Sequence, residues 1–163
     1  MEDSGSSDPD GSFRLSGFLT PERTIVLNAS DKRSVLNSLI ELLAKTPQIT
    51  SKAELADGIF RREALMSTGI GLGIAIPHVR LASVTGMVMA AALVPNGISD
   101  YESLDNQPVR LVVMIAARLD QHAEYLQLLS CLSSELKADS FRAGLFRCTN
   151  ASELFRELIS QDR

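Results

Sequence analysis

The residues best suited to chemistry in this sequence lie in a short segment that ends in Pro77-His78. An unperturbed histidine has a pKa near ~6.5, so at pH 7 it is largely neutral and a free ring nitrogen can attack phosphorus. Pro77 has a fixed φ and no N–H group, which allows the next side chain to be held rigidly at a strand end. These residue types predict that His78 accepts a phosphoryl group, although a histidine beside a glycine-rich loop is also typical of a plain turn.

A glycine-rich segment precedes His78 and is the predicted phosphate-binding loop. Glycines at alternate positions tolerate positive φ and allow close approach of a ligand, and successive N–H groups can form a concave anion site. Two hydroxyl side chains add hydrogen-bond donors. The candidate phosphate-binding residues are Ser67, Thr68, Gly69, Gly71 and Gly73. The charge on a transferring phosphoryl group also needs a cation, and Arg62 is the candidate.

Other kinds of active site find little support in this chain. The glycine pattern is neither a Walker A loop nor GxGxxG, which argues against a nucleotide site. No serine or cysteine stands in a nucleophile-elbow setting, and two histidines without a carboxylate cluster give no metal signature. Cys131 and Cys148 are too few for a disulfide scaffold and are predicted to be buried thiols. We therefore expect neither a metal nor a cofactor.

Length and composition are those of one ordinary soluble domain: 163 residues, of which 45% are apolar and 22% charged. A formal net charge of -4 leaves no basic excess for a nucleic-acid partner. The longest apolar stretches, 84–94 and 111–117, fall short of the roughly 18–20 residues of a membrane helix, so we expect no membrane insertion. The acidic start differs from a secretory signal, which favours a cytoplasmic protein. Residues 1–12 are predicted to be a disordered tail.

The elements that must position the candidate site alternate between strands and helices. A β-branched run at 24–27 predicts a strand, and apolar residues at helical spacing predict a helix that begins at Ser30. Ser51-Lys52-Ala53-Glu54 has the form of a capping box, which opens a second helix. A very short strand at 74–76 is then predicted to end at Pro77.

The second half of the chain predicts the centre of a sheet and more helices. Two continuous apolar runs, 87–94 and 109–117, are typical of central strands covered on both faces. Pro95-Asn96-Gly97 predicts a turn, and 98–107 includes at most a brief edge strand. Further helices are predicted beyond Asp120, at 141–146 and at 152–159. Together these elements predict an α/β fold, a three-layer α/β sandwich in which a mixed β-sheet is flanked by helices on both faces.

The candidate site resembles the phosphorylation-site signature of the type 2 (mannitol/fructose-type) enzyme IIA domains of the bacterial phosphotransferase system. The likeness rests on Arg62-Glu63, Ser67-Thr68-Gly69-Ile70-Gly71 and Gly73-Ile74-Ala75-Ile76-Pro77-His78. The segment Leu104–Val109 and the leucine pattern from Tyr125 to Leu132 are similar to the second half of such domains. We therefore expect an enzyme IIA type 2-like domain over residues 18–162. With no fused transporter, the chain resembles the free-standing nitrogen-regulatory branch of this family.

The resemblance implies a function and roles for particular residues. In such domains the histidine of the Pro-His pair, here His78, accepts a phosphoryl group through Nε2 from a small histidine-containing phosphocarrier protein. A downstream sugar permease domain or a regulatory target is the implied recipient. Arg62, sixteen positions before His78, matches the family's arginine near the phosphoryl group. Ser67 and Thr68 carry over as donors that line the site.

Three departures from the family pattern concern the surroundings of His78. Family members usually have a second histidine where Tyr125 stands here, and a phenol is not cationic near pH 7. His122, one turn earlier, is either a substitute for that histidine or an exposed residue at a helix start, and we favour the second interpretation. Val79 and Met66 add apolar bulk where smaller residues are usual.

Three hypotheses about function follow from these residues. The first is a phosphohistidine carrier or regulatory switch of the phosphotransferase system, because phosphorylation adds about −1.5 to −2 charges to the site. The second is a transfer-deficient regulatory module that binds proteins through the enzyme IIA docking surface alone. The third is a metabolite-binding domain that uses the loop 69–73 for a small anion.

Overall fold

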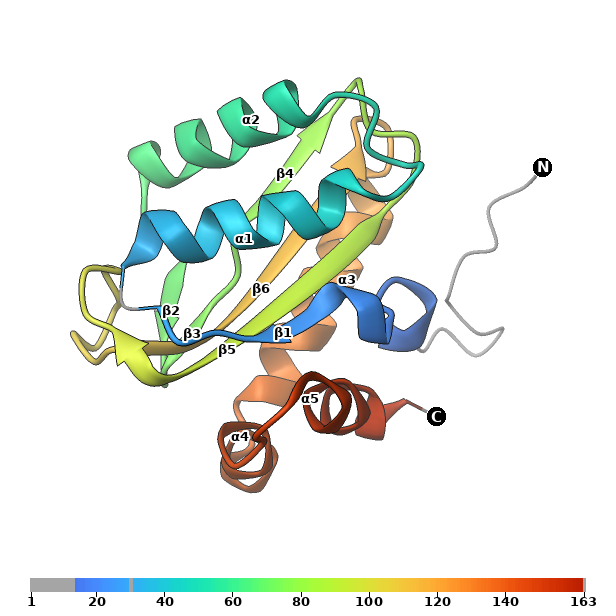
Figure 1. Cartoon of the computed structure of the whole chain (residues 1–163). Helices are drawn as coiled ribbons and strands as arrows, with labels where there is room; N and C mark the ends of the chain where they lie inside the picture. Colours follow the sequence, from blue (N-terminus) through green and yellow to red (C-terminus); the bar gives the residue numbers. More distant parts are fainter. Residues whose placement is uncertain (1–13, 30, 163) are drawn as a thin grey trace.

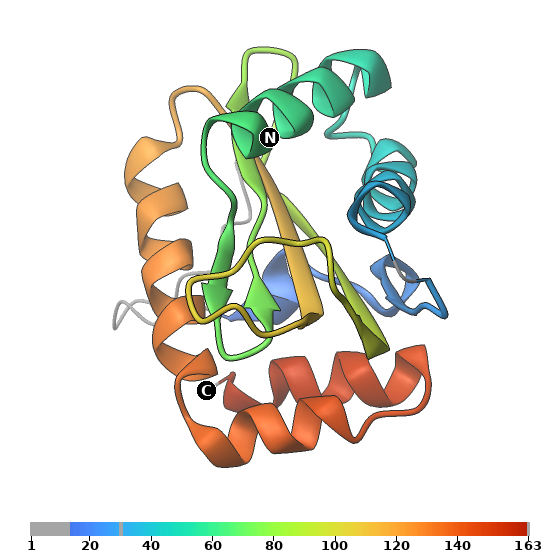
Figure 2. The ribbon, with the colours of Figure 1, turned by 90° about the vertical axis from the view of Figure 1, so that its left-hand side faces the viewer.

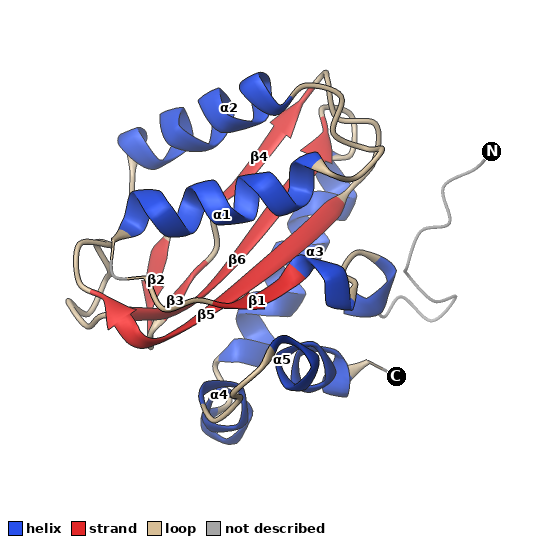
Figure 3. Ribbon diagram, viewed as in Figure 1, coloured by secondary structure: helices blue, strands red, loops and turns tan. Residues whose placement is uncertain are grey.

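The computed structural model describes residues 14–29 and 31–162 and shows a mixed sheet between two layers of helices (Figures 1 and 3). The three-layer α/β sandwich predicted from the sequence is confirmed. The predicted disordered tail at 1–12 and the predicted helix start at Ser30 lie outside the described residues. Among the described residues, no helix has both the length and the apolar character that crossing a membrane requires.

The sheet of the described residues has six strands. They are β1 (Thr24–Val26), β2 (Gly69–Gly71), β3 (Ile74–Ala75), β4 (His78–Leu81), β5 (Val88–Ile98) and β6 (Val109–Arg118). Their order is β1-β5-β6-β3-β2, and β4 also pairs with β6. β5 and β6 are antiparallel at the centre, whereas β1 is parallel to β5 and both β3 and β4 are parallel to β6. The two predicted central strands are confirmed.

β3 and β4 are two pieces of one broken strand beside β6. Ala75 pairs with Val112 and His78 pairs with Ile115, so the chain keeps its register across the break. Pro77 has no N–H to donate to the ladder, but its carbonyl accepts a hydrogen bond of 3.0 Å from the Ile115 N–H. His78 therefore begins a new strand, which the sequence pattern had not predicted.

Two helices cover one face of the sheet, α1 (Lys32–Ala44) and α2 (Lys52–Leu65). The Asp31 carboxylate accepts a hydrogen bond from the Ser34 N–H (3.0 Å) at the start of α1. The Ser51 hydroxyl accepts one from the Glu54 N–H (3.1 Å) at the start of α2, which confirms the predicted beginning of that helix. These caps satisfy N–H groups that have no partner within a helix.

Three helices lie on the other side: α3 (His122–Leu136), α4 (Asp139–Phe146) and α5 (Ala151–Leu158). Short 3-10 turns lie at Leu15–Gly17, Pro21–Arg23 and Ile159–Gln161. Figure 2 shows α3 across the sheet from α1 and α2. Alternate residues of β5 face the two cores, with Met89 and Leu93 towards α3 to α5 and Ala90 and Val94 towards α1 and α2. Both faces of the sheet are therefore buried.

The predicted turn at Pro95-Asn96-Gly97 was wrong, because β5 continues through these residues to Ile98. β1 pairs with β5 only as far as Leu93. Beyond Leu93, the described strands pair with β5 on its β6 side alone, and the other side is open. A proline on the open side needs no ladder bond, and the register shifts between Leu93 and Ile98. Gly97 takes up a φ of 84° within this irregular stretch. The turn residues therefore make a bulge rather than a chain reversal.

The two thiols differ in burial. Cys148 is buried, as predicted, but Cys131 is only half-buried, and neither forms a disulfide. Cys131 lies on α3 at the margin of the core, where its thiol donates to the Glu135 carboxylate at 3.6 Å. A place at that margin leaves part of the sulfur side chain in contact with solvent.

Candidate functional site

His78 is half-buried at the first position of β4. Its Nδ1 lies 2.6 Å from the carbonyl oxygen of Ile76. A carbonyl oxygen can only accept a hydrogen bond, so Nδ1 carries the proton and Nε2 keeps its lone pair. The backbone next to His78 therefore selects the tautomer whose Nε2 is nucleophilic.

The surroundings of His78 hold its pKa below the ordinary value of 6.5. Burial of the ring is the largest cause, because it disfavours the cation, and the bond to the Ile76 carbonyl acts in the opposite direction. The Arg62 charge lowers the pKa further, while the Glu63 carboxylate raises it. A lowered pKa keeps the imidazole neutral at pH 7, as attack on phosphorus requires.

Tyr125 lies against the His78 ring. The two ring centroids are 5.7 Å apart and the planes are tilted by 59°. Burial raises the pKa of the Tyr125 phenol to about 12, so this group is a neutral donor. His122 is the first residue of α3 and is exposed, as favoured from the sequence. The structure thus brings Tyr125, and not a second imidazole, against the histidine ring.

Arg62, the candidate cation predicted from the sequence, lies in the last turn of α2. Its Nη1 donates a hydrogen bond of 2.8 Å to the carbonyl oxygen of Met66. The positive charge of Arg62 lowers the pKa values of both His78 and Tyr125. Arg62 is therefore held by the main chain, and its charge acts on the candidate acceptor.

Arg80 is a cation of the site that sequence reasoning missed. It follows His78 by two residues on β4, and its guanidinium carbon lies 5.6 Å from the centroid of the Tyr125 ring. Spacing of i and i+2 would have shown that both side chains share a face, but only if the segment had been identified as a strand. No such strand had been predicted beyond Pro77.

Ser67 and Thr68 lie beside the chain that precedes His78, because the Thr68 carbonyl accepts a hydrogen bond of 3.1 Å from the Ile76 N–H. The Thr68 hydroxyl is buried and donates to the Glu63 carboxylate. The Ser67 hydroxyl donates to the carbonyl of Glu102 (2.6 Å). A hydroxyl has one proton to donate, so in this structure both predicted phosphate donors are already engaged.

Glu63 is the centre of a buried polar network that the sequence did not reveal. Its carboxylate pairs with Lys32 Nζ at 2.9 Å and accepts from the Tyr101 hydroxyl at 3.2 Å. Lys32 also lies over the Tyr101 ring, 4.4 Å from its centroid. Burial and the Glu63 charge raise the pKa of Tyr101, which remains a protonated donor. The network ties α1, α2 and the loop at 99–107 together beneath Thr68.

The glycines predicted to bind phosphate build a hairpin instead. Gly69 and Gly71 belong to β2, and the turn into β3 has positive φ at Leu72 (62°) and Gly73 (79°). The chain from Gly73 to His78 is largely extended over five residue steps. These steps separate the two Cα atoms by roughly 16 Å. Gly71 and Gly73 therefore lie at the far end of the hairpin from the histidine, and their N–H groups do not form a cradle around it.

The tip of this hairpin borders a pocket of about 270 Å³. It is lined by Leu72, Gly73, Asn96, Gly97, Asp105, Gln107, Pro108, Arg110 and Phe146. The Asp105 carboxylate accepts a bond of 2.9 Å from the Leu72 N–H, and such N–H bonds hold the Asp105 pKa below its usual value. The pocket therefore holds an ionised carboxylate together with the Arg110 guanidinium, so its lining does not select an anion by charge alone.

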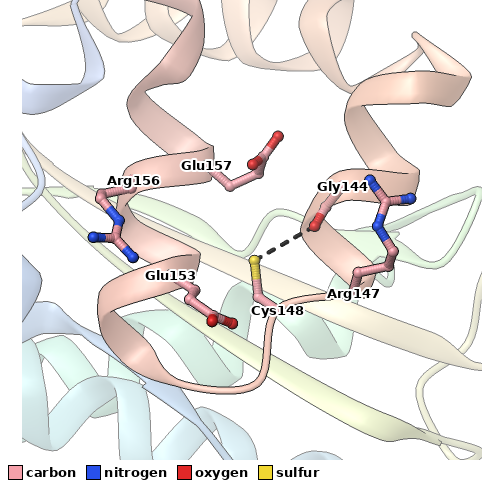
Figure 4. Close-up of a pocket in the computed structure, with 6 residues that line it drawn as sticks. All are labelled: Gly144, Arg147, Cys148, Glu153, Arg156 and Glu157. Atoms are coloured by element: carbon pink, nitrogen blue, oxygen red, sulfur yellow. Dashed lines mark hydrogen bonds between the residues drawn. The ribbon is translucent and has the colours of Figure 1, made fainter.

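A second pocket, of about 250 Å³, lies between α4 and α5 (Figure 4). Its lining residues are Gly144, Arg147, Cys148, Glu153, Arg156 and Glu157. The Cys148 thiol donates to the Gly144 carbonyl at 3.4 Å, and burial raises the pKa of this thiol. A raised pKa favours the protonated thiol, which is a poor nucleophile, so this pocket gives no support for a catalytic cysteine.

Comparison with known proteins agrees with these observations. The family described as "Phosphoenolpyruvate-dependent sugar phosphotransferase system, EIIA 2" matches residues 18–161. A fructose-specific EIIABC component from Bacillus subtilis is 36% identical over 91% of this chain but only 23% of its own length. The nitrogen regulatory protein IIA-Ntr of Neisseria meningitidis has a TM-score of 0.81 and 26% identity, covering 88% of this chain and 98% of its own. A complex of enzyme IIAMTL with phosphorylated enzyme IIBMTL from Escherichia coli has a TM-score of 0.72 and 25% sequence identity. The match covers 88% of this chain and 98% of the matched chain.

The structure combines a half-buried histidine, whose Nδ1 is bonded to the main chain, with a three-layer α/β sandwich. The chain belongs to the type 2 enzyme IIA family of the phosphoenolpyruvate-dependent sugar phosphotransferase system, as the site motif had indicated. Its function is that of a phosphocarrier or regulatory domain of that system.

Proposed function

We propose that His78 accepts a phosphoryl group through Nε2 from a phosphohistidine of a small phosphocarrier protein. The phosphoryl group is then relayed to a downstream permease domain or kept as a regulatory mark. The Nε2 lone pair forms the new N–P bond while the N–P bond of the donor breaks and its electron pair stays on the donor ring. The proton on Nδ1 does not move, because it remains bonded to the Ile76 carbonyl.

The single observation that supports this proposal most is the bond of 2.6 Å between Nδ1 and the Ile76 carbonyl. It leaves Nε2 as the unprotonated ring nitrogen, and the lowered pKa of His78 favours this neutral form at pH 7. Arg62 supplies positive charge next to the acceptor, where charge on the phosphoryl group develops. We assign no role at the phosphorus atom to Gly71 or Gly73.

Exposed apolar side chains border the proposed acceptor. Leu65 is 84% exposed and Met66 70% exposed at the end of α2, and Leu119 and Leu126 are also exposed beyond β6 and on α3. An apolar rim around a charged centre is typical of a protein-docking surface. The E. coli relative forms a complex with a phosphorylated enzyme IIB domain. We infer that the rim receives first the phosphocarrier and then the recipient protein.

Replacing Leu65 by aspartate is expected to weaken docking without destabilising the fold, because the side chain is almost fully exposed. The donor concentration at half-maximal transfer should rise at least about 10-fold, while the rate at saturating donor is kept. Transfer kinetics with a phosphorylated phosphocarrier protein measure both values.

Leu104→Asp is the matched control, because Leu104 is 83% exposed but lies in the loop at 99–107, beside β2. It should leave both kinetic values unchanged. If Leu65→Asp and Leu104→Asp changed the half-saturating donor concentration equally, the docking surface would not be centred on Leu65.

Transfer of radioactive phosphate from that donor is also the experiment that tests the proposal as a whole. The label should be lost in acid and survive in base, as a phosphoramidate does. An unlabelled protein that still binds the phosphocarrier would instead indicate the transfer-deficient regulatory module.

A further inference from the structure

Arg80 and His78 occupy the same face of β4, because successive side chains of a strand alternate in direction. Two residue steps along a strand separate their Cα atoms by roughly 7 Å. The Tyr125 ring lies against both groups, 5.7 Å from the His78 ring centroid and 5.6 Å from the Arg80 guanidinium carbon. His78 and the cationic Arg80 side chain therefore contact the same aromatic ring from one face of one strand.

The Arg80 guanidinium has a main-chain partner in the structure. Its Nη1 donates a bond of 2.6 Å to the Leu119 carbonyl, just beyond the end of β6. A guanidinium carries five N–H donors in one plane, so this bond orients the group and leaves other donors for an anion. Donors held in position need little reorganisation when negative charge develops in front of them.

The other charged or titratable groups near this place come from three elements. They are Arg62 and Glu63 on α2, His122, Glu124 and Tyr125 on α3, and Arg118 and Asp120 at the end of β6. Glu63 is paired with Lys32, Arg118 is paired with Asp120, and Tyr125 is neutral. His122 is exposed at the helix start. The cations relevant to His78 are therefore Arg62, whose charge lowers the pKa of His78, and Arg80 on the histidine's own strand.

We propose that the Arg80 guanidinium binds the phosphoryl oxygens on His78 and is, with Arg62, the second cation of the site. This inference rests on the proposed function. An arginine stays charged throughout the physiological range, whereas a histidine in that role would lose its charge as the pH rises. Arg80 therefore supplies electrostatic support that does not titrate, at a site where the neighbouring ring is a neutral phenol.

The test uses the full chain and a phosphorylated phosphocarrier protein as donor. The saturated transfer rate and the half-saturating donor concentration are measured for wild type, Arg80→Gln, Arg80→Lys and Arg80→His between about pH 6 and pH 8. Each rate is divided by the wild-type rate at the same pH, so that the pH dependence of the donor cancels. Arg61→Gln is the matched control, because Arg61 is exposed and paired with Asp57 (2.8 Å) on α2.

Arg80→Gln should lower the saturated rate roughly 10- to 100-fold with little change in half-saturation, and Arg80→Lys should restore most of it. Arg80→His should behave like lysine at the acid end and like glutamine at the alkaline end. Such a change of the transfer rate with pH within one variant would show that the charge at position 80, and not misfolding, sets the rate. Transfer at the wild-type rate by Arg80→Gln, or equal slowing by all three variants at every pH, would overturn the inference. An unlabelled wild type would instead overturn the proposed function itself.

Discussion

Replacement of His78 by alanine should abolish labelling by a phosphorylated phosphocarrier, with a loss of at least about 1000-fold. The reason is that Nε2 of His78 carries a lone pair and no proton, whereas the hydroxyls of Ser67, Thr68 and Tyr125 keep their protons. The Tyr125 ring lies against the His78 ring, and a pKa of about 12 keeps its phenol protonated. Incorporation of phosphate per chain, measured after separation from the donor, gives the result directly.

His122→Ala is the control for this experiment, because the chain has only two histidines. His122 is exposed at the start of α3, so its removal should leave both labelling and folding unchanged. Label that persists on His78→Ala and disappears from His122→Ala would reverse the assignment of the acceptor.

Gly69→Ala should destabilise the fold by about 3 kcal/mol, which corresponds to a fall in Tm of roughly 6–12 °C for a chain of this size. A Cβ atom at Gly69 would lie 2.2 Å from the carbonyl oxygen of Glu102 and 3.0 Å from the Cα atom of Ser103. Both are backbone atoms, which cannot rotate away. Thermal unfolding followed by circular dichroism measures the effect.

The matched control is Gly86→Ala, where the nearest atom to the added methyl group is the flexible Gln48 Cγ at 3.4 Å. Its stability should stay within about 1 kcal/mol of wild type. Alanine keeps the backbone N–H, so a loss confined to Gly69→Ala reports close packing of β2 against the loop at 99–107. Equal Tm values for the two variants would mean that this close approach does not exist.

The sequence predicted the layers of the fold because hydrophobic periodicity is strong where a strand is buried on both faces. Ala90, Val94 and their neighbours in β5 and β6 are apolar for this reason. β4 has the opposite character, since all four of its residues are half-buried. A sequence of His, Val, Arg and Leu shows neither continuous burial nor clear alternation, and the strand was missed together with Arg80.

The candidate site was predicted in part, through the family motif and the rare histidine. The motif led to His78 and Arg62, and the Arg62 charge lowers the pKa of His78. It could not show that the Thr68 hydroxyl is engaged by Glu63, because that carboxylate is buried through contacts with Lys32 and Tyr101, which are distant in sequence. The roles of these residues at phosphorus remain predictions.

The glycines show why residue type alone was insufficient. Gly71 and Gly73 have positive φ, as a phosphate-binding loop would require, but a tight hairpin requires the same conformation. Only the pairing of β2 with β3 decides between the two uses. That pairing places the turn at the far end of β3 from His78.

The most direct test of the account is to identify the ring nitrogen that carries phosphorus. The chain, labelled with nitrogen-15 in its two histidines, would be phosphorylated and studied by nitrogen-15 and phosphorus-31 NMR. We expect one phosphorylated ring, that of His78, with phosphorus coupled to Nε2 and the Nδ1 proton still present and hydrogen-bonded to Ile76. Phosphorus on Nδ1, or on the ring of His122, would contradict it.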